Sequence, residues 1–476
     1  MEPSRVWRDY VRTATKQTLT GHTGSLAGKP IAVKDNIVTA SRPTTAASRV
    51  LSGFTSPFDA TVVKLLQDAG ASVESKSSLD EFGMGSHSQT SFPTPVQSPF
   101  SRGGLPLSPG GSSGGSAVAV ATGEAWVALG TDTGGSVRLP AAYCGVVGFK
   151  PSYGLLSRWG VIQYANSLDT VGVLAGNVED TGKVFNALNT YDINDPTSLA
   201  DNVRQRIASQ ASPKSTSLRI GIPQEYNIEE LTAPVREAWI LTLSRLQRAG
   251  HALVPVSLPT TQQALSAYYV LAPAEASSNL AKYDGVRYGQ RSTPGSDAVP
   301  KESLPLYART RGEGFGEEVR RRILLGAYAL SSEAIDNYFI LAQKIRRLVQ
   351  KDFDRVFAAK NPLHDTPESQ ANEGVDFLLA PTAPSLPPTL ADLEQQTTVE
   401  GYMLDVFTVP ASLAGLPALS VPVPIQDSAR KNMDAGDVKT VGMQIIGQYG
   451  SDEGVLEVGR IIEDLCTESP HAPKHQ

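Results

Sequence analysis

The chain is poor in cysteine and histidine and lacks long apolar runs. It has 476 residues but only two cysteines, Cys144 and Cys466, and six histidines. Two isolated cysteines provide neither a disulfide framework nor a metal cluster, so we expect no metal site. No run of about 18 apolar residues is present, so we expect no membrane span. A Ser-His-Asp hydrolase is poorly supported because His364, His471 and His475 lie in polar, solvated-looking segments.

Positive charge is also not in excess. The chain carries 42 basic and 48 acidic residues, for a net charge of −6. A protein that grips nucleic acid directly usually has a strongly basic surface. Direct nucleic-acid binding by this chain is therefore not indicated.

Two short Gly/Ser loops are the most informative feature that is present. They are Gly110–Ser116 and Gly130–Ser136, and Ser136 follows Ser112 by 24 positions. A phosphate-binding P-loop would need a Gly-Lys-Ser/Thr ending, which is absent. A dinucleotide loop would follow a strand, and the proline-rich segment 105–109 is a poor strand. Ser113 matches the centre of a Gly-x-Ser-x-Gly elbow, but that motif also needs a histidine and an acid.

A third element is the isolated Lys34 that ends the apolar run from Pro30. A lysine and two loop serines suffice for a hydrolytic site without histidine, provided that the amine is neutral. An unperturbed lysine is only about one part in a thousand neutral near pH 7.4. Burial lowers a lysine pKa, and the run predicts a buried strand. Asp35 would oppose this shift, but neighbouring strand residues point to opposite faces.

These motifs, together with Pro140–Pro151, resemble the amidase signature family of serine hydrolases. The resemblance implies an α/β fold with one large domain, in which helices cover both faces of a mixed central sheet. It implies that Ser136 is the nucleophile, that Ser112 is a relay after a cis peptide bond at Gly111, and that Lys34 is the general base. Cys144 is then interpreted as a small buried residue.

The same resemblance assigns the surroundings of the nucleophile. Backbone N–H groups of Thr133, Gly134, Gly135 and Ser136 would form the oxyanion hole. Asp132 and Arg138 flank this loop and are expected to support it through charge-assisted hydrogen bonds.

A narrower resemblance joins the chain to the A-type subunits of glutamyl-tRNA(Gln) amidotransferases. It rests on segments such as Ala274–Leu280, Gly314–Ile323 and Thr408–Pro417. It implies an amidase that hydrolyses glutamine within an ATP-dependent carbon–nitrogen ligase. Ammonia would pass to a B-type tRNA-binding partner that amidates activated Glu-tRNA(Gln), beside a small third subunit. ATP and Mg²⁺ are expected on the partner, with no cofactor bound by this chain and only indirect contact with tRNA.

Free glutamine carries an ammonium and a carboxylate, so its site needs a carboxylate and a guanidinium. By resemblance these are Asp405 and Arg322, with Arg320 or Arg321 as alternatives if the register shifts. Asp405 lies in an otherwise apolar segment, where a lone carboxylate is costly unless it has a role. Tyr288 is a weaker candidate for the pocket.

Two other functions stay open. A stand-alone amidase for fatty-acid or aryl amides would need an apolar pocket in place of Arg322 and Asp405. A scaffold subunit without catalysis would not need Lys34, Ser112 and Ser136, and their presence argues against it.

The chain divides into an amidase domain at 28–468, a segment at 1–27 interpreted as targeting or partner-docking, and a polar tail at 469–476. Arg5, Arg8, Arg12 and Lys16 recur at helical spacing. A shortened N-terminal region and a polar insert at 361–374 depart from the bacterial pattern. They favour a mitochondrial protein, in the matrix, with the cytoplasm as the alternative for a bacterial chain.

Apolar periodicity predicts the main elements. Strands are expected at 30–34, 72–76, 218–223, 252–258, 375–381 and 441–446. Helices are expected at 56–69, 233–249, 260–283, 316–328, 332–357 and 452–466, and polar loops at 190–216 and 425–439.

Overall fold

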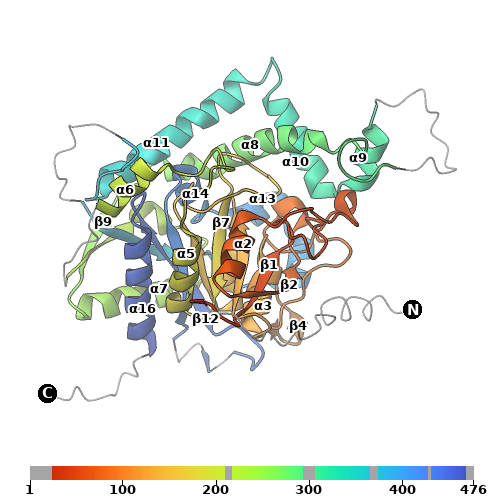
Figure 1. The fold of residues 1–476 in the computed structure, drawn as a ribbon. Helices are drawn as coiled ribbons and strands as arrows, with labels where there is room; N and C mark the ends of the chain where they lie inside the picture. The colour runs from red at the N-terminus through yellow and green to blue at the C-terminus, as the bar shows by residue number, and fades with distance from the viewer. Residues whose placement is uncertain are drawn as a thin grey trace.

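A central sheet organises the molecule. The computed structural model describes residues 24–209, 217–292, 306–364, 374–426, 430–431 and 433–467. Within them, a ten-stranded sheet of mixed direction is covered by helices on both faces, as Figure 1 shows. The expected α/β class is therefore confirmed. The polar tail and most of the 1–27 segment lie outside the described residues, as does 365–373 of the insert.

The strands from the N-terminal part of the chain lie together on one side of the sheet. The strands, in spatial order, are β2 (Ser72–Ser77), β1 (Pro30–Lys34), β5 (Val127–Asp132), β7 (Thr170–Ala175), β6 (Val147–Lys150), β11 (Ala418–Pro424), β12 (Thr440–Gly447), β10 (Phe377–Pro381), β8 (Arg219–Pro223) and β9 (Ala252–Val256). β1 is parallel to both β2 and β5. Because parallel neighbours end at the same edge of a sheet, the carboxyl ends of β1 and β5 lie together.

Helices form two covering layers and a third group beyond them. One face carries α3 (Gly114–Ala121) and α4 (Arg138–Cys144), and the other carries α2 (Thr61–Asp68), α5 (Val178–Leu188), α7 (Ala233–Arg248) and α16 (Asp452–Thr467). The third group packs α8 (Thr261–Asn279) against α10 (Glu317–Ala329), α11 (Leu341–Val356) and α14 (Val409–Ala414). Shorter helices are α6 (Asp201–Ser209), α9 (Ala308–Gly314), α12 (Leu390–Gln395) and α13 (Thr398–Met403), and a two-stranded ribbon joins β3 (Ser101–Arg102) to β4 (Leu105–Pro106).

Alternation along β1 decides which side Lys34 faces. Ile31 and Val33 pack into the main core between the sheet and the layer of α2, α5, α7 and α16. Ala32 packs into the separate core beneath α3 and α4. Strand residues two apart share a face, so Lys34 points to the α3 side, as Ala32 does.

Several sequence expectations need correction at their boundaries. The first helix begins at Thr61 and not at Ser56, since an extended segment precedes it. The stretch 190–216 is not all loop, because Asp201–Ser209 forms the surface helix α6. The helix expected at 332–357 starts instead with a π-helical turn, η5 (Asp336–Ile340), which leads into α11. Among the described residues, no helix is both long and apolar enough to cross a membrane.

Helices α8 and α10 touch at a point that only glycine permits. A Cβ added at Gly326 of α10 would lie 1.9 Å from the backbone oxygen of Pro273 in α8. Pro273 lies inside α8 and has no backbone N–H, so this part of the helix is also irregular. The two helices are therefore closely joined at this point.

We predict that Gly326→Ala destabilises the protein by about 1–3 kcal/mol, since an added methyl must push two packed backbones apart. The free energy of unfolding, measured with urea, checks this. Gly312→Ala is the control, because its Cβ would meet nothing within 4 Å. Equal stability of both variants would contradict the close packing.

Candidate active site

Lys34 is surrounded by hydroxyl and carbonyl oxygens. Its Nζ donates to Ser112 Oγ and Ser113 Oγ at 2.8 Å each, and to the Thr131 carbonyl at 3.3 Å. The lysine side chain is fully buried at the end of β1. Ser112 and Ser113 immediately precede α3, and Thr131 lies near the end of β5. The structure thus brings together two segments that the sequence separates by 78 positions.

The environment lowers the proton affinity of this lysine. Burial lowers the pKa of Lys34 from 10.5 to about 7, against opposing effects of Asp80, Asp132 and Asp169. Asp35 does not contribute, since its carboxylate faces Lys76 at 3.3 Å. This arrangement agrees with the opposite orientation expected for strand neighbours. Near neutral pH a large fraction of Lys34 is therefore an unprotonated amine.

The second serine loop connects β5 to α4. The Gly111–Ser112 peptide bond is cis, as the family resemblance implies. The N–H of Ser113 donates to the carbonyl of Ser136 at 3.1 Å, which joins the two loops. Ser112 is buried whereas Ser136 is partly exposed. Of the two serines, Ser136 is therefore the one that a substrate can reach.

Two side chains fix the segment 133–136. Thr133 Oγ1 donates to Asp169 at 2.7 Å. Gly134 lies against the ring of Tyr268, so closely that an added Cβ would lie 2.7 Å from its Cζ. The predicted oxyanion-hole residues thus sit on a short loop held from both sides.

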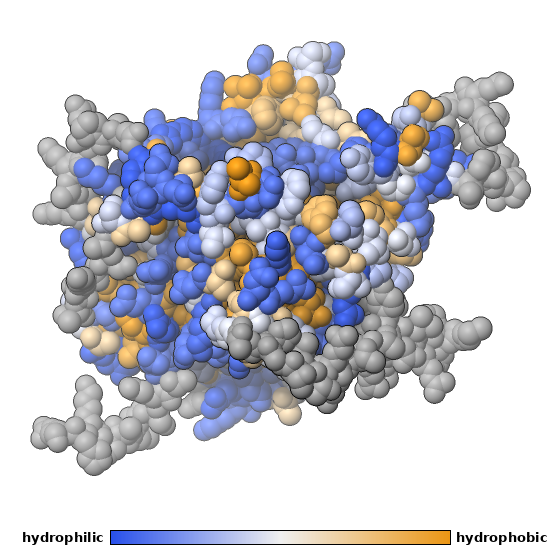
Figure 2. All heavy atoms as spheres, in the orientation of Figure 1, coloured by the Kyte–Doolittle hydropathy of each residue, from blue (hydrophilic) through white to orange (hydrophobic). Residues whose placement is uncertain are grey.

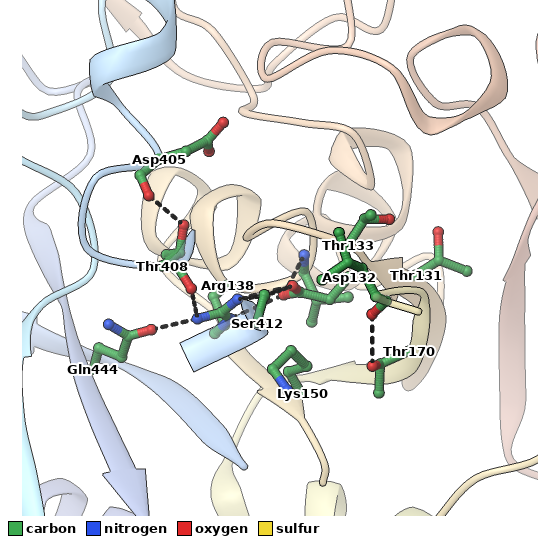
Figure 3. A network of polar contacts seen from close by, with 12 residues as sticks. Thr131, Asp132, Thr133, Arg138, Lys150, Thr170, Asp405, Thr408, Ser412 and Gln444 are labelled. Atoms are coloured by element: carbon green, nitrogen blue, oxygen red, sulfur yellow. Dashed lines mark hydrogen bonds and ion pairs between the residues drawn. The ribbon is translucent and has the colours of Figure 1, made fainter. Parts of the chain in front are cut away.

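Asp132 and Arg138 form a buried ion pair below this loop. The guanidinium donates to both carboxylate oxygens, at 3.0 and 2.8 Å, and both side chains are fully buried. It also donates to the Thr408 carbonyl, Ser412 Oγ and Gln444 Oε1, at 2.9, 2.8 and 2.6 Å (Figure 3). Burial alone would raise the pKa of Asp132, but Arg138 holds it below its ordinary value. The pair ties the start of α4 to α14 and β12.

Arg322 and Asp405 meet at Tyr269. Arg322 is buried, donates to Glu318 at 2.7 Å and to Tyr164 at 2.6 Å, and has its guanidinium 5.6 Å from the Tyr269 ring centre. Tyr269 donates its hydroxyl proton to Asp405 at 3.2 Å. Arg320 and Arg321 are exposed, so the geometry favours the register at Arg322.

Asp405 is buried and only lightly compensated. It accepts one hydrogen bond from Ser86 Oγ at 3.0 Å in addition to that from Tyr269. Burial raises the pKa of Asp405 to about 6, although these hydroxyls and Arg322 lower it. A cationic group bound here would remove the penalty of burying the carboxylate.

Tyr288 lies elsewhere. Its side chain is 57% exposed and lines a separate surface pocket that also includes Phe54, Gln163 and Lys282. The structure thus does not bring Tyr288 together with Arg322 and Asp405.

Other residues near these groups were not found from the sequence. Tyr164, Tyr268, Tyr269 and Ser86 belong to no motif, and Tyr268–Tyr269 looks like ordinary helix sequence. Ser113 was visible as the centre of an elbow motif, but its place here is as a second hydrogen-bond partner of Lys34.

Cys144 is buried, and burial raises the pKa of its thiol to about 12, so it is a poor nucleophile. Within the described residues, no group of three or more His, Cys, Asp or Glu side chains could hold a metal.

Comparison with known proteins assigns the class. Residues 7–456 match the amidase family, and the chain belongs to that family. It is similar to the A-type subunit of the mitochondrial glutamyl-tRNA(Gln) amidotransferase of Ajellomyces capsulatus, with 55% identity over 96% of this chain and 94% of that protein. The corresponding protein of Emericella nidulans is 56% identical over 96% of this chain and 93% of that protein. The resemblance drawn from the sequence is confirmed.

Solved structures agree with the assignment of the chain to the amidase family. The A-type subunit of the glutamyl-tRNA(Gln) amidotransferase of Thermotoga maritima superposes with a TM-score of 0.72 at 35% identity, and covers 95% of this chain and 86% of its own. Allophanate hydrolase of Kluyveromyces lactis superposes with a TM-score of 0.71 at 26% identity, and covers 99% of this chain and 66% of its own. The fold is thus shared with enzymes of different substrates, so specificity depends on the residues around the loops.

We predict that Arg138→Ala lowers the free energy of unfolding by about 3–5 kcal/mol, because it leaves Asp132 buried without a counter-charge. Urea unfolding checks this. Arg309→Ala is the control, since Arg309 pairs with Glu313 while the two side chains are 41% and 53% exposed, and an exposed pair contributes about 1 kcal/mol or less. Similar losses of unfolding free energy in both variants would show that the buried Asp132–Arg138 pair stabilises the protein no more than an exposed pair does.

Proposed function

We propose that this chain is the glutamine-hydrolysing subunit of a glutamyl-tRNA(Gln) amidotransferase. The observation that carries the proposal is the buried Lys34, whose Nζ lies 2.8 Å from Ser112 Oγ, together with a buried guanidinium and a buried carboxylate that both contact Tyr269. Family membership and relatives named as A-type subunits of this enzyme support it. Ammonia would pass to a B-type tRNA-binding partner, which would use ATP and Mg²⁺ to amidate Glu-tRNA(Gln).

In the proposed reaction, neutral Lys34 accepts the proton of Ser112, which in turn accepts that of Ser136. The Ser136 oxygen then attacks the side-chain amide carbon of glutamine. N–H groups of 133–136 stabilise the oxyanion. As the C–N bond breaks, the relay returns the proton to the leaving nitrogen, and ammonia departs. Water then attacks the acyl-serine by the same relay, which releases glutamate and restores Ser136.

Selection of glutamine would rest on two charges. Asp405 would bind the α-ammonium and Arg322 the α-carboxylate. Both groups are already buried, but Arg322 is paired with Glu318 at 2.7 Å, so a substrate that lacks the ammonium leaves the buried Asp405 without a counter-charge. Tyr269 contacts both and would set their separation.

The cellular setting is part of the proposal. Relatives named as mitochondrial support a mitochondrial protein, which we place in the matrix. A small third subunit would complete the complex, and tRNA would be bound by the B-type partner.

A stand-alone amidase is the second candidate, because allophanate hydrolase shares the fold. The buried Arg322 and Asp405 argue against it, since an acyl or aryl group would not compensate their charges. The lowered pKa of Lys34 argues against a scaffold without catalysis, because a scaffold has no need of an amine that accepts a proton.

We predict that Ser136→Ala abolishes release of ammonia from glutamine, because the reaction has no other attacking oxygen. Ammonia is measured with and without the co-expressed partner subunits and Glu-tRNA(Gln). Cys144→Ala is the control and should keep activity, since its thiol is buried. Full activity in Ser136→Ala would contradict the assigned nucleophile.

We predict that Asp405→Asn lowers kcat/KM for glutamine by roughly 30-fold or more, because losing one partner of a buried charge pair costs about 2–5 kcal/mol. Simple amides without an α-ammonium should be hydrolysed as before. A parallel loss with both substrates would count against recognition of the ammonium.

We predict that kcat for glutamine hydrolysis rises with pH through an apparent pKa near 7, since burial depresses the pKa of Lys34 to about 7 and only the neutral amine accepts a proton. Lys34→Arg should be inactive across this range, because guanidinium stays protonated. The unfolded chain binds a proton that folded Lys34 lacks between pH 7 and 10.5, so this residue makes stability rise with pH in that window. A pH-independent rate would contradict the assigned base.

A further inference from the structure

The C-terminal half of α10 exposes several large apolar side chains, which follow the exposed Arg320 and Arg321. Leu324, Leu325 and Tyr328 are 70%, 47% and 59% exposed. The ring of Tyr328 lies 5.8 Å from that of Tyr338, which extends the surface into η5. Exposed Tyr338, Ile340 and Leu341 complete what we call the α10–α11 apolar patch. Figure 2 shows hydrophobic residues gathered at the top of the molecule, where α10 is followed by η5 and α11.

The spacing on α10 indicates a helix that is covered on two sides. Val319, Arg322, Gly326 and Ala329 are buried against the rest of the protein. Leu324 and Tyr328, four positions apart, form a second stripe that faces outward. Large apolar side chains that remain exposed on a helix whose other side is already buried indicate a second contact surface. An exposed patch of this kind marks a surface for another protein.

Basic side chains continue the patch along α11. Lys344, Arg347 and Lys351 are exposed next to Leu348, which is itself 49% exposed. Within the described residues, no ion pair involves these three cations. A partner that covers this face would therefore present carboxylates to α11 and apolar side chains to α10. Nucleic acid fits less well, since aliphatic Leu324 and Leu325 offer no stacking surface for bases.

We propose that the α10–α11 apolar patch is the docking surface for the tRNA-binding partner, through a surface that is apolar at its centre and acidic toward α11. This inference rests on the proposed function. The activity of the partner that consumes the ammonia must be coordinated with glutamine hydrolysis. The patch lies on the outer side of α10, and the inner side of the same helix carries Arg322.

Contacts on the inner side of α10 connect the patch to the site. Arg322 belongs to the same helix and points inward. Glu81 accepts the N–H of Gly316 just before α10 at 2.8 Å, and Gly326 packs on α8 at Pro273. A displacement of α10 on docking would therefore move Arg322 and shift its neighbours through these contacts.

Helix α8 carries the connection to the chemistry. Its Tyr269 bonds Asp405, and its Tyr268 touches Gly134 of the predicted oxyanion-hole loop. A partner seated on α10 therefore acts on α8 through the close α8–α10 contact at Gly326 and Pro273. Docking is expected to raise glutamine hydrolysis and not only to hold the subunits together.

The test uses the full chain co-expressed with its partner subunits. The double variant Leu324→Gln/Tyr328→Gln should bind the tRNA-binding partner with an affinity reduced by about tenfold or more, as measured by titration and size-exclusion chromatography. The isolated double variant should hydrolyse a simple amide at the wild-type rate, which shows that it is folded. Ile193→Gln is the matched control, since Ile193 is 82% exposed and follows Asp192, which accepts hydrogen bonds from Thr61 of α2 and from Ser157 and not from α10 or α11.

A second variant tests the charge. Lys344→Glu/Lys351→Glu should weaken the complex. The loss of affinity should grow as the salt concentration is lowered, because repulsion between the new carboxylates and those of the partner is then less screened. Unchanged affinity in both double variants would overturn the proposal. So would a defect confined to the small third subunit, to tRNA binding by an intact complex, or to self-association. A wild-type complex that assembles through the patch but releases no ammonia from glutamine would instead count against the proposed function.

Discussion

The burial of Lys34 is the constraint on which the rest of the site depends. A buried ammonium is unfavourable, and that penalty is what lowers its pKa to about 7. Three carboxylates nearby, Asp80, Asp132 and Asp169, would otherwise restore the proton. Asp132 is paired with Arg138, which offsets its charge, and burial of the amine outweighs the remaining effects.

The partners of these carboxylates also fix the loops. Asp132 is paired with Arg138 and so anchors α4. Asp169 accepts the hydroxyl of Thr133 at 2.7 Å. Asp80 accepts the N–H of Ser88 at 2.8 Å, in the segment that also supplies Ser86 to Asp405. The groups that tune the amine therefore also hold the surrounding backbone, and a change in one alters the other.

Sequence reasoning succeeds where the chemistry is contiguous. Lys34 closes an apolar run and the serine loops are compact, so a family resemblance points to them, and the structure brings Lys34 Nζ within 2.8 Å of Ser112 Oγ. It fails where the site is assembled by packing: Tyr269 comes from inside a long helix and meets Asp405 across 136 positions. Tyr288 lies in another pocket, because only the path of the chain after α8 decides where its side chain is placed. Helix α6 is missed since its sequence is mostly polar and none of its residues is fully buried.

The electrostatics around Arg322 and Asp405 indicate how the proposed glutamine site would discriminate between substrates. Arg322 already has a carboxylate partner, since Glu318 lies 2.7 Å away, so an incoming α-carboxylate shares the guanidinium instead of meeting a bare charge. Asp405 has only hydroxyl donors and a pKa raised to about 6, so it gains most from a cation. Recognition of the ammonium therefore supplies the larger change in free energy. An amide that lacks the ammonium leaves Asp405 uncompensated, whereas one that lacks the carboxylate leaves Arg322 paired as before.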